Sequence, residues 1–290
     1  FPTRRSSDLA SIMWTDQIND FNYSVGGNIT YSRFWDWEQY KPRFSNSWDE
    51  YRNSIWHRVG YVNWGYEAIG RFDSWEQIAN YPVDNDRKGN RTVVPGDIMY
   101  KDQNNDGVIN YLDERPIGYR VDSTPTLNFG INLSASWKGF DLAMDWTGSG
   151  MTSWNQCYET ARPFQNDGNS PDEVLKDAWH LSDIWDANSP LIPGKYPMVR
   201  LNTDETSAYD KSSYWLHNVT YLKLRNLEVG YTFPKTWLNR TGISNLRLFV
   251  SGTNLLTLSN LSVMDPECAS DNGLDYPPMR VINIGVNLKF

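Results

Sequence analysis

The sequence predicts an all-β fold, an antiparallel transmembrane β-barrel to which this chain contributes about seven strands with long loops. Three observations lead to this prediction. Several segments alternate apolar and polar residues with a period of two, which is typical of strands with one apolar face. The connections between them alternate between short and long. No run of about 18 apolar residues is present, so a membrane-spanning helix is not expected.

Seven segments have a pattern that favours strands. In the segment that begins at Phe21, the side chains of Phe21, Tyr23 and Val25 share one face, and those of Asn22 and Ser24 share the other. The same alternation recurs in the other segments, although the first of them is short and partial. The expected strands are residues 10–16, 21–32, 126–137, 140–146, 221–233, 245–256 and 282–290.

Two of these strands are less regular than the others. Leu222 and Leu224 are in phase with each other, but the apolar positions then move to Leu227 and Val229. A phase change of one residue predicts a β-bulge at this point. Residues 245–256 have apolar side chains on both faces, so their pattern does not assign one buried face.

Three of the connections are long, at roughly residues 34–124, 151–217 and 259–279, whereas the turn at 137–140 is tight. Loops longer than about 15 residues are uncommon in compact domains. Outer-membrane barrels, in contrast, combine short periplasmic turns with long extracellular loops. We therefore expect an outer-membrane location with the long loops outside the cell. The aromatic end of the last strand, Phe290, fits the signal that the barrel-assembly machinery reads.

Both ends of the strand series bear on the domain organisation. An odd number of strands does not close a bacterial barrel, and an open edge in lipid leaves backbone groups unpaired. We therefore expect strands that precede this chain. The first nine residues, FPTRRSSDL, read as the translated end of a sequencing adapter, with a natural disordered tail as the alternative. Residues 1–9 are thus predicted to be an artefact, and residues 10–290 the C-terminal part of a barrel.

Composition excludes several classes of protein. The formal net charge of −8 argues against nucleic acid as a partner. The three histidines are isolated from one another and from other ligand residues in the sequence, so a zinc site is not expected. Cys157 and Cys268 are far apart in the chain, and their pairing stays open. No nucleophile motif or phosphate-binding loop is present, so these motifs single out no catalytic residue.

One acidic loop has the spacing of a calcium site. Asp102, Asn104 and Asp106 alternate before Gly107, Val108 would offer its carbonyl oxygen, and Asp113 stands at the twelfth place of the loop. A calcium sensor of the EF-hand type needs a helix on each side, whereas a strand is expected before this loop and a proline follows it. Two interpretations remain open, a calcium-clipped loop and a turn held by its own side chains.

The long loops are rich in aromatic residues. Trp154, Trp179 and Trp185 are candidates for stacking on the apolar face of a sugar ring, and packing of the loops or contact with a partner protein are the alternatives. Four aromatic residues are expected near strand ends, where they would form the girdles found at membrane interfaces. These are Trp14, Tyr31, Trp137 and Trp146.

Taken in order, several motifs resemble the SusC/RagA family of TonB-dependent outer-membrane transporters of Bacteroidetes. They include PGDIMYKDQNNDGVINYLDERPIG, YLKLRNLEVGYTFP, NLRLFVSGTNLLTLS, DPE and YPPMRVINIGVNLKF. The resemblance extends over residues 10–290. It implies a plug domain and a barrel of about 22 strands, of which this chain would supply the last seven or so, without the plug or the TonB box.

The resemblance also implies a function. Members import oligosaccharides or oligopeptides, are energised through the TonB complex, and pair with a SusD-like surface lipoprotein that covers the mouth of a barrel set in outer-membrane lipid. No catalytic residue and no required cofactor are implied, although calcium could occupy the loop at 102–113. One alternative is a secreted or surface carbohydrate-binding β-sandwich with a calcium-clipped loop, and another is a cell-surface glycosidase domain.

Overall fold

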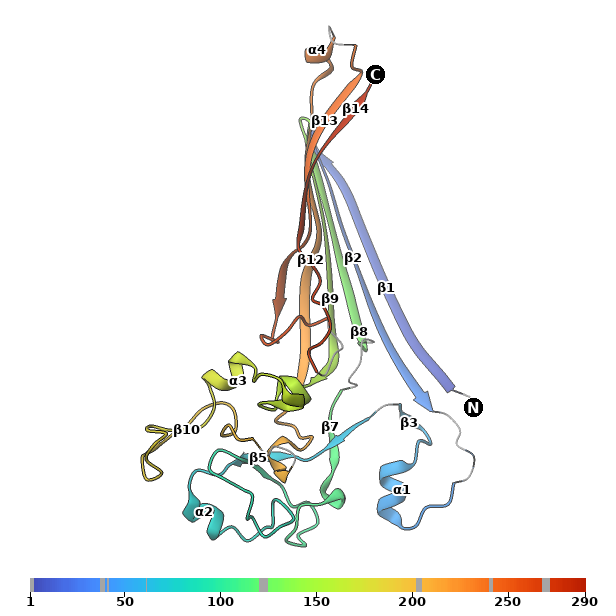
Figure 1. Ribbon diagram of the computed structural model, residues 1–290. Helices are drawn as coiled ribbons and strands as arrows, with labels where there is room; N and C mark the ends of the chain where they lie inside the picture. The colour runs from blue at the N-terminus through green and yellow to red at the C-terminus, as the bar shows by residue number, and fades with distance from the viewer. Residues whose placement is uncertain are drawn as a thin grey trace.

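Seven long strands form one antiparallel sheet in the computed structural model of the chain (Figure 1). The structure describes residues 3–36, 40, 42–60, 62–119, 125–201, 205–239, 242–267 and 272–290. The strands are arranged in the order in which they occur in the chain, each beside the next. They are β1 (Thr3–Ile18), β2 (Phe21–Asp36), β8 (Leu127–Trp137), β9 (Phe140–Asn155), β12 (Leu216–Thr232), β13 (Asn245–Ser259) and β14 (Val281–Lys289).

The seven predicted strands are all confirmed, but their ends differ from the prediction. β1 begins at Thr3, which lies opposite Asp36 of β2, so the strand backbone continues through residues that precede Ala10. Whether residues 1–9 belong to the natural protein stays a prediction. β9 continues to Asn155, because Gly148 pairs with Leu222 of β12 and Gly150 with Leu127 of β8 as strand residues instead of ending the strand. Trp146, expected near a strand end, therefore lies in the middle of β9.

The register aligns residues of one kind across the whole sheet. One row on the first face of the sheet contains only large apolar side chains. A row on the other face contains mainly small or polar side chains. The apolar row is Phe21, Trp137, Phe140, Tyr231, Leu248 and Val286. A row on the polar face is Ser24, Ser134, Ala143, Glu228, Ser251 and Asn283. The alternation predicted for single strands is thus shared by all of them.

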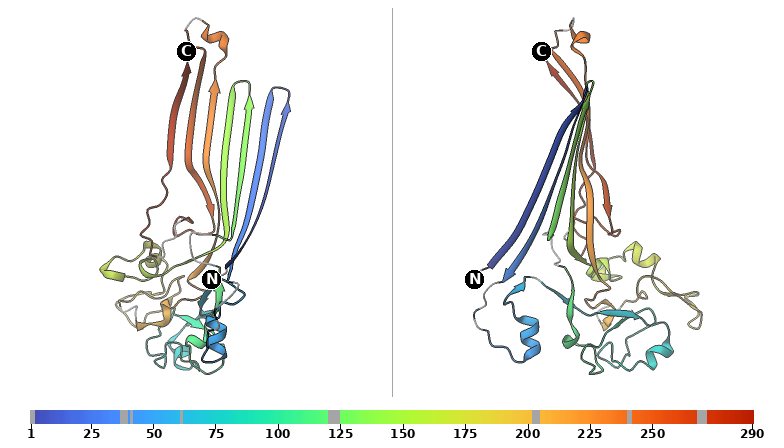
Figure 2. Two further views of the ribbon diagram at one scale, coloured as in Figure 1. Left: turned by 90° about the vertical axis from the view of Figure 1, so that its right-hand side faces the viewer. Right: turned by 180° about the vertical axis from the view of Figure 1, so that it is seen from behind.

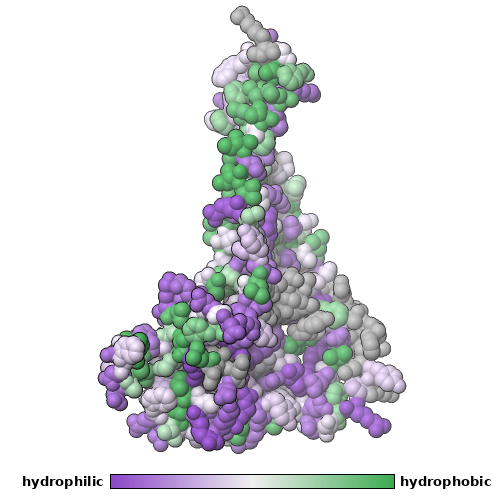
Figure 3. Space-filling view, in the orientation of Figure 1, coloured by the Kyte–Doolittle hydropathy of each residue, from purple (hydrophilic) through white to green (hydrophobic). Residues whose placement is uncertain are grey.

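Much of the apolar face is open to the surroundings. Ile284 of β14, for example, is 84% exposed, and large apolar side chains are exposed on every strand of the sheet. Figure 3 shows hydrophobic residues along the upper, sheet-forming part of the molecule, whereas hydrophilic residues dominate the lower part. An exposed apolar surface of this extent marks contact with another apolar medium or partner.

A β-bulge lies in β12 at the position where the apolar phase changes. The pairing of β12 with both neighbouring strands shifts register between Leu224 and Asn226. Arg225 is the additional residue relative to β9, whereas β13 places two residues, Asn254 and Leu255, against Arg225. Opposite it in β13, Asn254 has a left-handed backbone with a φ of 55°. The predicted bulge is therefore confirmed. The mixed pattern of β13 also has a local cause, since the ring of Phe249 lies over Gly285, where a side chain would collide with it.

Short and long connections lie at opposite ends of the sheet (Figure 2). β8 and β9 are joined through Lys138 and Gly139, both with positive φ, as a two-residue hairpin turn requires. β1 and β2 are joined by the two residues Asn19 and Asp20, and the connection between β12 and β13 at this end contains α4 (Lys235–Leu238). The long links gather at the other end.

Two of the long links fold together into what we call the loop body, the described residues of 42–119 and 156–215. Among the described residues, no helix is long and apolar enough to cross a membrane. Tyr100, Tyr196 and Trp215 are fully buried in the largest apolar cluster of the loop body. Its helices and strands are α1 (Ser47–Asn53), β3 (Arg58–Val59), β4 (Asn63–Gly65), β5 (Ala68–Arg71), α2 (Trp75–Ala79), β6 (Ile98–Tyr100), β7 (Arg115–Gly118), α3 (Asp172–Lys176), β10 (His180–Leu181) and β11 (Leu191–Ile192), with 3-10 turns at Tyr111–Asp113, Tyr158–Thr160, Gln165–Asp167 and Ser207–Tyr209.

Candidate functional site in the long loops

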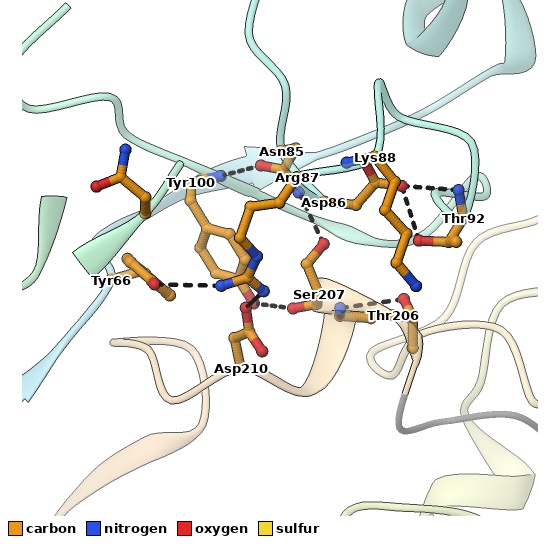
Figure 4. Close-up of polar contacts among 12 residues, drawn as sticks. Tyr66, Asn85, Asp86, Arg87, Lys88, Thr92, Tyr100, Thr206, Ser207 and Asp210 are labelled. Carbon is orange, nitrogen blue, oxygen red and sulfur yellow. Dashed lines mark hydrogen bonds and ion pairs between the residues drawn. The ribbon is translucent and has the colours of Figure 1, made fainter. Parts of the chain in front are cut away.

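Ion pairs between residues far apart in the sequence join the two links of the loop body. Arg87 donates to Asp210 at 2.6 Å and to the hydroxyl of Tyr66 at 3.5 Å, and it lies between them in Figure 4. Arg200 donates to the buried carboxylate of Asp97 at 2.5 Å. Burial raises the pKa of Asp97 although Arg200 opposes this effect. The pairs hold residues 84–101 against residues 200–210.

A turn at Asn85–Thr92 is organised by two buried side chains. The Asn85 amide donates to Ser207 and to a carbonyl oxygen of β6, and its oxygen accepts the backbone N–H of Tyr100 (Figure 4). The Asp86 carboxylate accepts three backbone N–H groups and the Thr92 hydroxyl, at 2.7–2.8 Å. Burial alone would raise the pKa of Asp86, but these hydrogen bonds outweigh it and lower the pKa to about 2.

The acidic loop packs directly on this turn. The Asp84 backbone N–H donates to the Gly107 carbonyl at 2.8 Å, and the Asp84 carbonyl accepts from Ile109 at 2.9 Å. β6 precedes the loop and β7 follows it, so strands take the places that helices would occupy in an EF-hand. The acidic loop is thus part of the loop body's framework and not a separate sensor module.

The side chains of the acidic loop bind its own backbone. Asp102 accepts N–H groups of Asn105 and Gly107, Asn104 accepts that of Asp106, and Asp106 accepts that of Val108. Both oxygens of the buried Asp113 likewise accept backbone N–H groups, at 2.8 Å. The side-chain amide of Asn104 and the hydrogen bond to Val108 lower the pKa of Asp106. The alternative of a turn held by its own side chains accounts for every one of these contacts.

The five candidate calcium ligands therefore share one loop, but their carboxylates do not converge. Within the described residues, which include the whole of 102–113, no group of three or more His, Cys, Asp or Glu side chains is placed to hold a metal ion. The oxygens of Asp102 and Asp113 are directed to backbone donors of the loop. Calcium binding by this loop stays a prediction.

The three candidate tryptophans have different environments. Trp154 is buried at the end of β9, where it stacks on His217 with ring centroids 5.6 Å apart. Trp179 is buried beneath Gly96, at which any side chain would collide with the indole. Both rings pack the interior, which was the alternative interpretation, and neither offers a free face to a sugar in this structure. Trp185, in contrast, is 90% exposed on the loop between β10 and β11.

A buried charge cluster joins the last long link to the sheet. Lys223 of β12 is 1% exposed, and its ammonium lies 2.6 Å and 2.7 Å from the carboxylate oxygens of Asp265 and 2.9 Å from Glu267. Arg225, the bulge residue, also pairs with Glu267. The Tyr221 hydroxyl donates to the same carboxylate at 3.2 Å. Two cations thus meet two carboxylates, and the cluster is electrically balanced.

The charge cluster fixes residues 260–267 against the sheet. Leu261, Val263 and Met264 pack on the buried group that includes Trp154. Burial raises the pKa of Glu267, but the hydrogen bonds from Arg225 and Lys223 outweigh burial and lower it. The sequence reasoning missed this cluster. Its available signal was a lysine on the polar face of a strand, followed by the two carboxylates of the DPE motif.

Other charged residues on the polar face of the sheet also have structural partners. Arg247 of β13 pairs with Asp141 of β9 and, at 2.6 Å, with Glu228 of β12. The Asn132 amide donates to Asp145 at 2.7 Å. These contacts bridge neighbouring strands. Cys157 is partly exposed, and Cys268 lies outside the described residues, so their pairing stays open.

Comparisons with known proteins agree with this architecture. The chain is 30% identical over 242 residues to the TonB-dependent receptor P3 of Formosa agariphila, an alignment that covers 77% of the chain and 22% of the relative. It is 24% identical to the TonB-dependent receptor SusC of Bacteroides thetaiotaomicron, over 81% of the chain and 20% of SusC. No protein-family model matches.

Solved structures give the same result. The chain superposes on a structure of the RagAB peptide importer in its closed-closed state with a TM-score of 0.66, at 20% identity, over 99% of the chain and 30% of that structure. A second structure of the RagAB peptide transporter gives a TM-score of 0.64. The chain belongs to the TonB-dependent receptors of the SusC/RagA type.

This membership explains the exposed apolar face of the sheet. Receptors of the SusC/RagA type are outer-membrane β-barrels, and the seven strands form part of such a barrel wall. The apolar face is then the lipid face, because barrel strands turn apolar residues to lipid and polar residues to the interior. The chain spans about a fifth of the length of the curated relatives that it matches. These relatives of the chain are receptors and not enzymes.

Proposed function

We propose that this receptor chain is part of a TonB-driven importer that takes up oligosaccharides or oligopeptides. One observation supports the proposal most strongly, namely a wall with a continuous lipid face in a chain whose relatives are TonB-dependent receptors. The wall residues would form one side of the transport path. Among the described residues the long strands form one sheet, and this argues against a carbohydrate-binding sandwich of two packed sheets.

Cargo uptake by cells tests this proposal. Cells that lack the receptor gene should lose TonB-dependent accumulation of one class of labelled oligomer, and a plasmid copy should restore it. Oligosaccharides and oligopeptides of similar mass form the two arms of the assay. The proposal would be contradicted if uptake of both oligomers stayed unchanged after loss of the gene, or after collapse of the proton gradient.

The proposed importer includes a SusD-like lipoprotein as its lid, and Trp185 is the residue we assign to this contact. Trp185 and its neighbour Ile184 are the largest exposed apolar pair on the loop between β10 and β11. Figure 1 shows this hairpin protruding from the loop body. Exposed tryptophans that insert into a partner are frequent hot spots of binding energy.

Binding of the lipoprotein to a purified receptor variant tests this assignment. Trp185→Ala should weaken the complex by about tenfold or more, as expected for a hot-spot residue. Trp237→Ala is the matched control, since Trp237 is exposed on α4 at the short-turn end, far from the loop body. Equal affinities of the two variants would exclude Trp185 from the lid contact.

Calcium in the acidic loop is a further part of the proposal. Asp102, Asp106 and Asp113 bring three negative charges to a single loop, and a calcium ion would offset their repulsion. Addition of calcium should then raise the thermal unfolding temperature of the receptor, and Asp102→Asn should remove this shift. Magnesium is the control cation. An unfolding temperature that calcium does not change would leave the side-chain-to-backbone bonds as the sole support of the loop.

A further inference from the structure

Three arginines and three aromatic rings form one cluster on the side of the loop body where β2 ends. We call the set Trp48, Tyr51, Arg52, Arg58, Trp64 and Arg115 the arginine–aromatic cluster. Trp48 and Tyr51 come from α1, Trp64 comes from β4 and Arg115 from β7. The rings contact one another with centroids 5.2–6.4 Å apart.

The guanidinium groups lie against the aromatic rings. Arg52 lies 4.6 Å from the centroid of Trp64, and Arg58 lies 5.7 Å from both Trp64 and Tyr51. Arg115 lies 4.9 Å from the centroid of Trp48. Cation–π contact occupies the ring faces and holds each guanidinium in place. It therefore fixes the positions of three cations with little remaining side-chain freedom.

Most of the N–H groups of these guanidiniums remain available. Arg52 donates through Nε to Glu114 at 3.0 Å, and Arg58 donates one N–H to the Arg52 carbonyl at 3.4 Å. Arg115 donates through Nη1 to the carbonyls of Leu112 and Glu114. Within the described part of the chain, no partner is recorded for Nε and Nη2 of Arg58. Stacking uses the flat face of a guanidinium, whereas hydrogen bonds form at its edge, so both can occur together.

The charge of the cluster is unusual for this chain. Three guanidiniums face the paired carboxylate of Glu114, and Asp36 of β2 lies opposite Arg58 in the strand register, which leaves a formal excess of one positive charge in a chain whose net charge is −8. The neighbouring carboxylate of Asp49 is used within α1 and its approach, where it accepts from Ser45 and Asn53. An oxyanion that entered the cluster would therefore replace water at charged donors that lack a protein partner.

We propose that the arginine–aromatic cluster is a binding site for a ligand with carboxylate or sulfate groups. The oxyanion binds the edges of the guanidiniums, with Arg58 as the central contact, and the partly exposed ring of Tyr51 contacts the adjoining part of the ligand. Uronic-acid or sulfated oligosaccharides and acidic peptides share this chemistry. As a cargo site the cluster rests on the proposed importer function, whereas anion binding itself does not require transport.

Isothermal titration of the complete receptor in detergent tests the site. The probes are an oligogalacturonate, a neutral oligosaccharide of the same length and a glutamate-rich peptide. At least one anionic probe should bind about tenfold or more tightly than the neutral one, and added salt should weaken it. Which anionic probe binds identifies the source of the oxyanion. Equal affinity for the neutral and anionic probes would overturn the proposal.

Variants at Arg58 locate the binding to the cluster. Arg58→Gln should weaken the anionic probe by about tenfold, and Arg58→Lys should weaken it less, because lysine retains the charge but loses the planar fork. Arg280→Gln is the matched control, since Arg280 is exposed in the last long link. Parental affinity in both Arg58 variants would refute the site. Uptake of a neutral cargo by the same cells reports import separately.

Discussion

The barrel wall and the loop body arrange the same amino-acid types in opposite ways. In the wall, large apolar residues such as Ile284 and Val25 are exposed, and polar residues such as Ser24 occupy the other face. In the loop body, Tyr100 and Trp215 are fully buried in an apolar cluster, whereas charged residues such as Asp172 and Lys176 are exposed. A soluble domain buries apolar area to remove it from water, whereas the wall places it where lipid replaces water.

This difference shows that the chain is adapted to two solvents. The wall obtains its order from backbone pairing with immediate neighbours, since every strand pairs with the next one in the sheet. The loop body obtains its order from contacts between distant residues, such as Arg200 with Asp97 and Arg87 with Asp210. Variants that exchange the two environments should therefore have unequal effects in the two regions.

The largest effect is expected where the two regions are joined, at the charge cluster. Lys223→Ala leaves the carboxylate of Asp265 without its buried cation and Glu267 with Arg225 alone, and it should destabilise the folded receptor by about 3–5 kcal/mol. Urea unfolding in detergent measures this change, and limited proteolysis should show earlier cleavage of the last long link. Lys289→Ala, at the exposed end of β14, is the control. Equal stability of the two variants would mean that the cluster does not hold this link.

A charge on the lipid face should have the next largest effect. Val25→Arg places a guanidinium toward the hydrocarbon and should cost about 2–4 kcal/mol near the middle of the membrane. Ser24→Arg, one residue away on the polar face, should be tolerated because its side chain faces the interior. Unfolding in lipid vesicles distinguishes the two variants. A larger loss for Ser24→Arg would reverse the assignment of the faces.

The Asp86 turn predicts a pH-dependent effect within the loop body. The folded-state pKa of about 2 lies below the ordinary 3.8, so this carboxylate stabilises the fold above about pH 3.8 and the contribution is lost as the pH falls through about 2. Asp86→Asn should therefore cost about 2 kcal/mol at pH 7 and almost nothing at pH 2. Asp20→Asn, in an exposed short turn, is the control for unfolding at both pH values. A deficit that persists unchanged at pH 2 would point to lost packing instead of lost charge.

The smallest effect is expected at an exposed ion pair of the loop body. Lys176 lies 2.5 Å from Asp172 on α3, but both side chains are largely exposed to water. Lys176→Ala should change the free energy of unfolding by less than about 0.5 kcal/mol. The same urea titration measures it, and a loss of the size expected for Lys223→Ala would show that α3 is buried in the assembled receptor.

The wall was predictable from sequence because its pattern is local. Period-two alternation identified all seven strands, and the phase change between Leu224 and Leu227 located the bulge. The sequence pattern did not predict the extension of β9, because Gly148 resembles the end of a strand. The structure needs glycine at this position so that the ring of Phe129 can lie over the backbone. The alternation within one strand does not predict which residue of the neighbouring strand lies over a glycine.

The loop body was not predictable, because its contacts join residues that lie far apart in the sequence. The spacing of Asp102, Asn104 and Asp106 indicated a turn held by its own side chains as one of two interpretations, yet it did not show which backbone donors these side chains bind. Composition likewise did not distinguish the buried Trp154 and Trp179 from the exposed Trp185. Contacts between loops that lie far apart in the sequence determine these environments, and the alternation of residues along one segment does not predict such contacts.

The bulge at Arg225 limits how the wall can vary among relatives. Side chains alternate between lipid and interior, so a single deletion within a strand would exchange the two faces from that point to the next turn. Arg225 is an added residue that restores the apolar phase between the two halves of β12. In evolution, gains and losses of single residues should therefore be confined to the loops or to the register shifts of the wall, which lie at Arg225 and between Val219 and Tyr221. Alignments of relatives should show constant lengths for the wall segments between these positions.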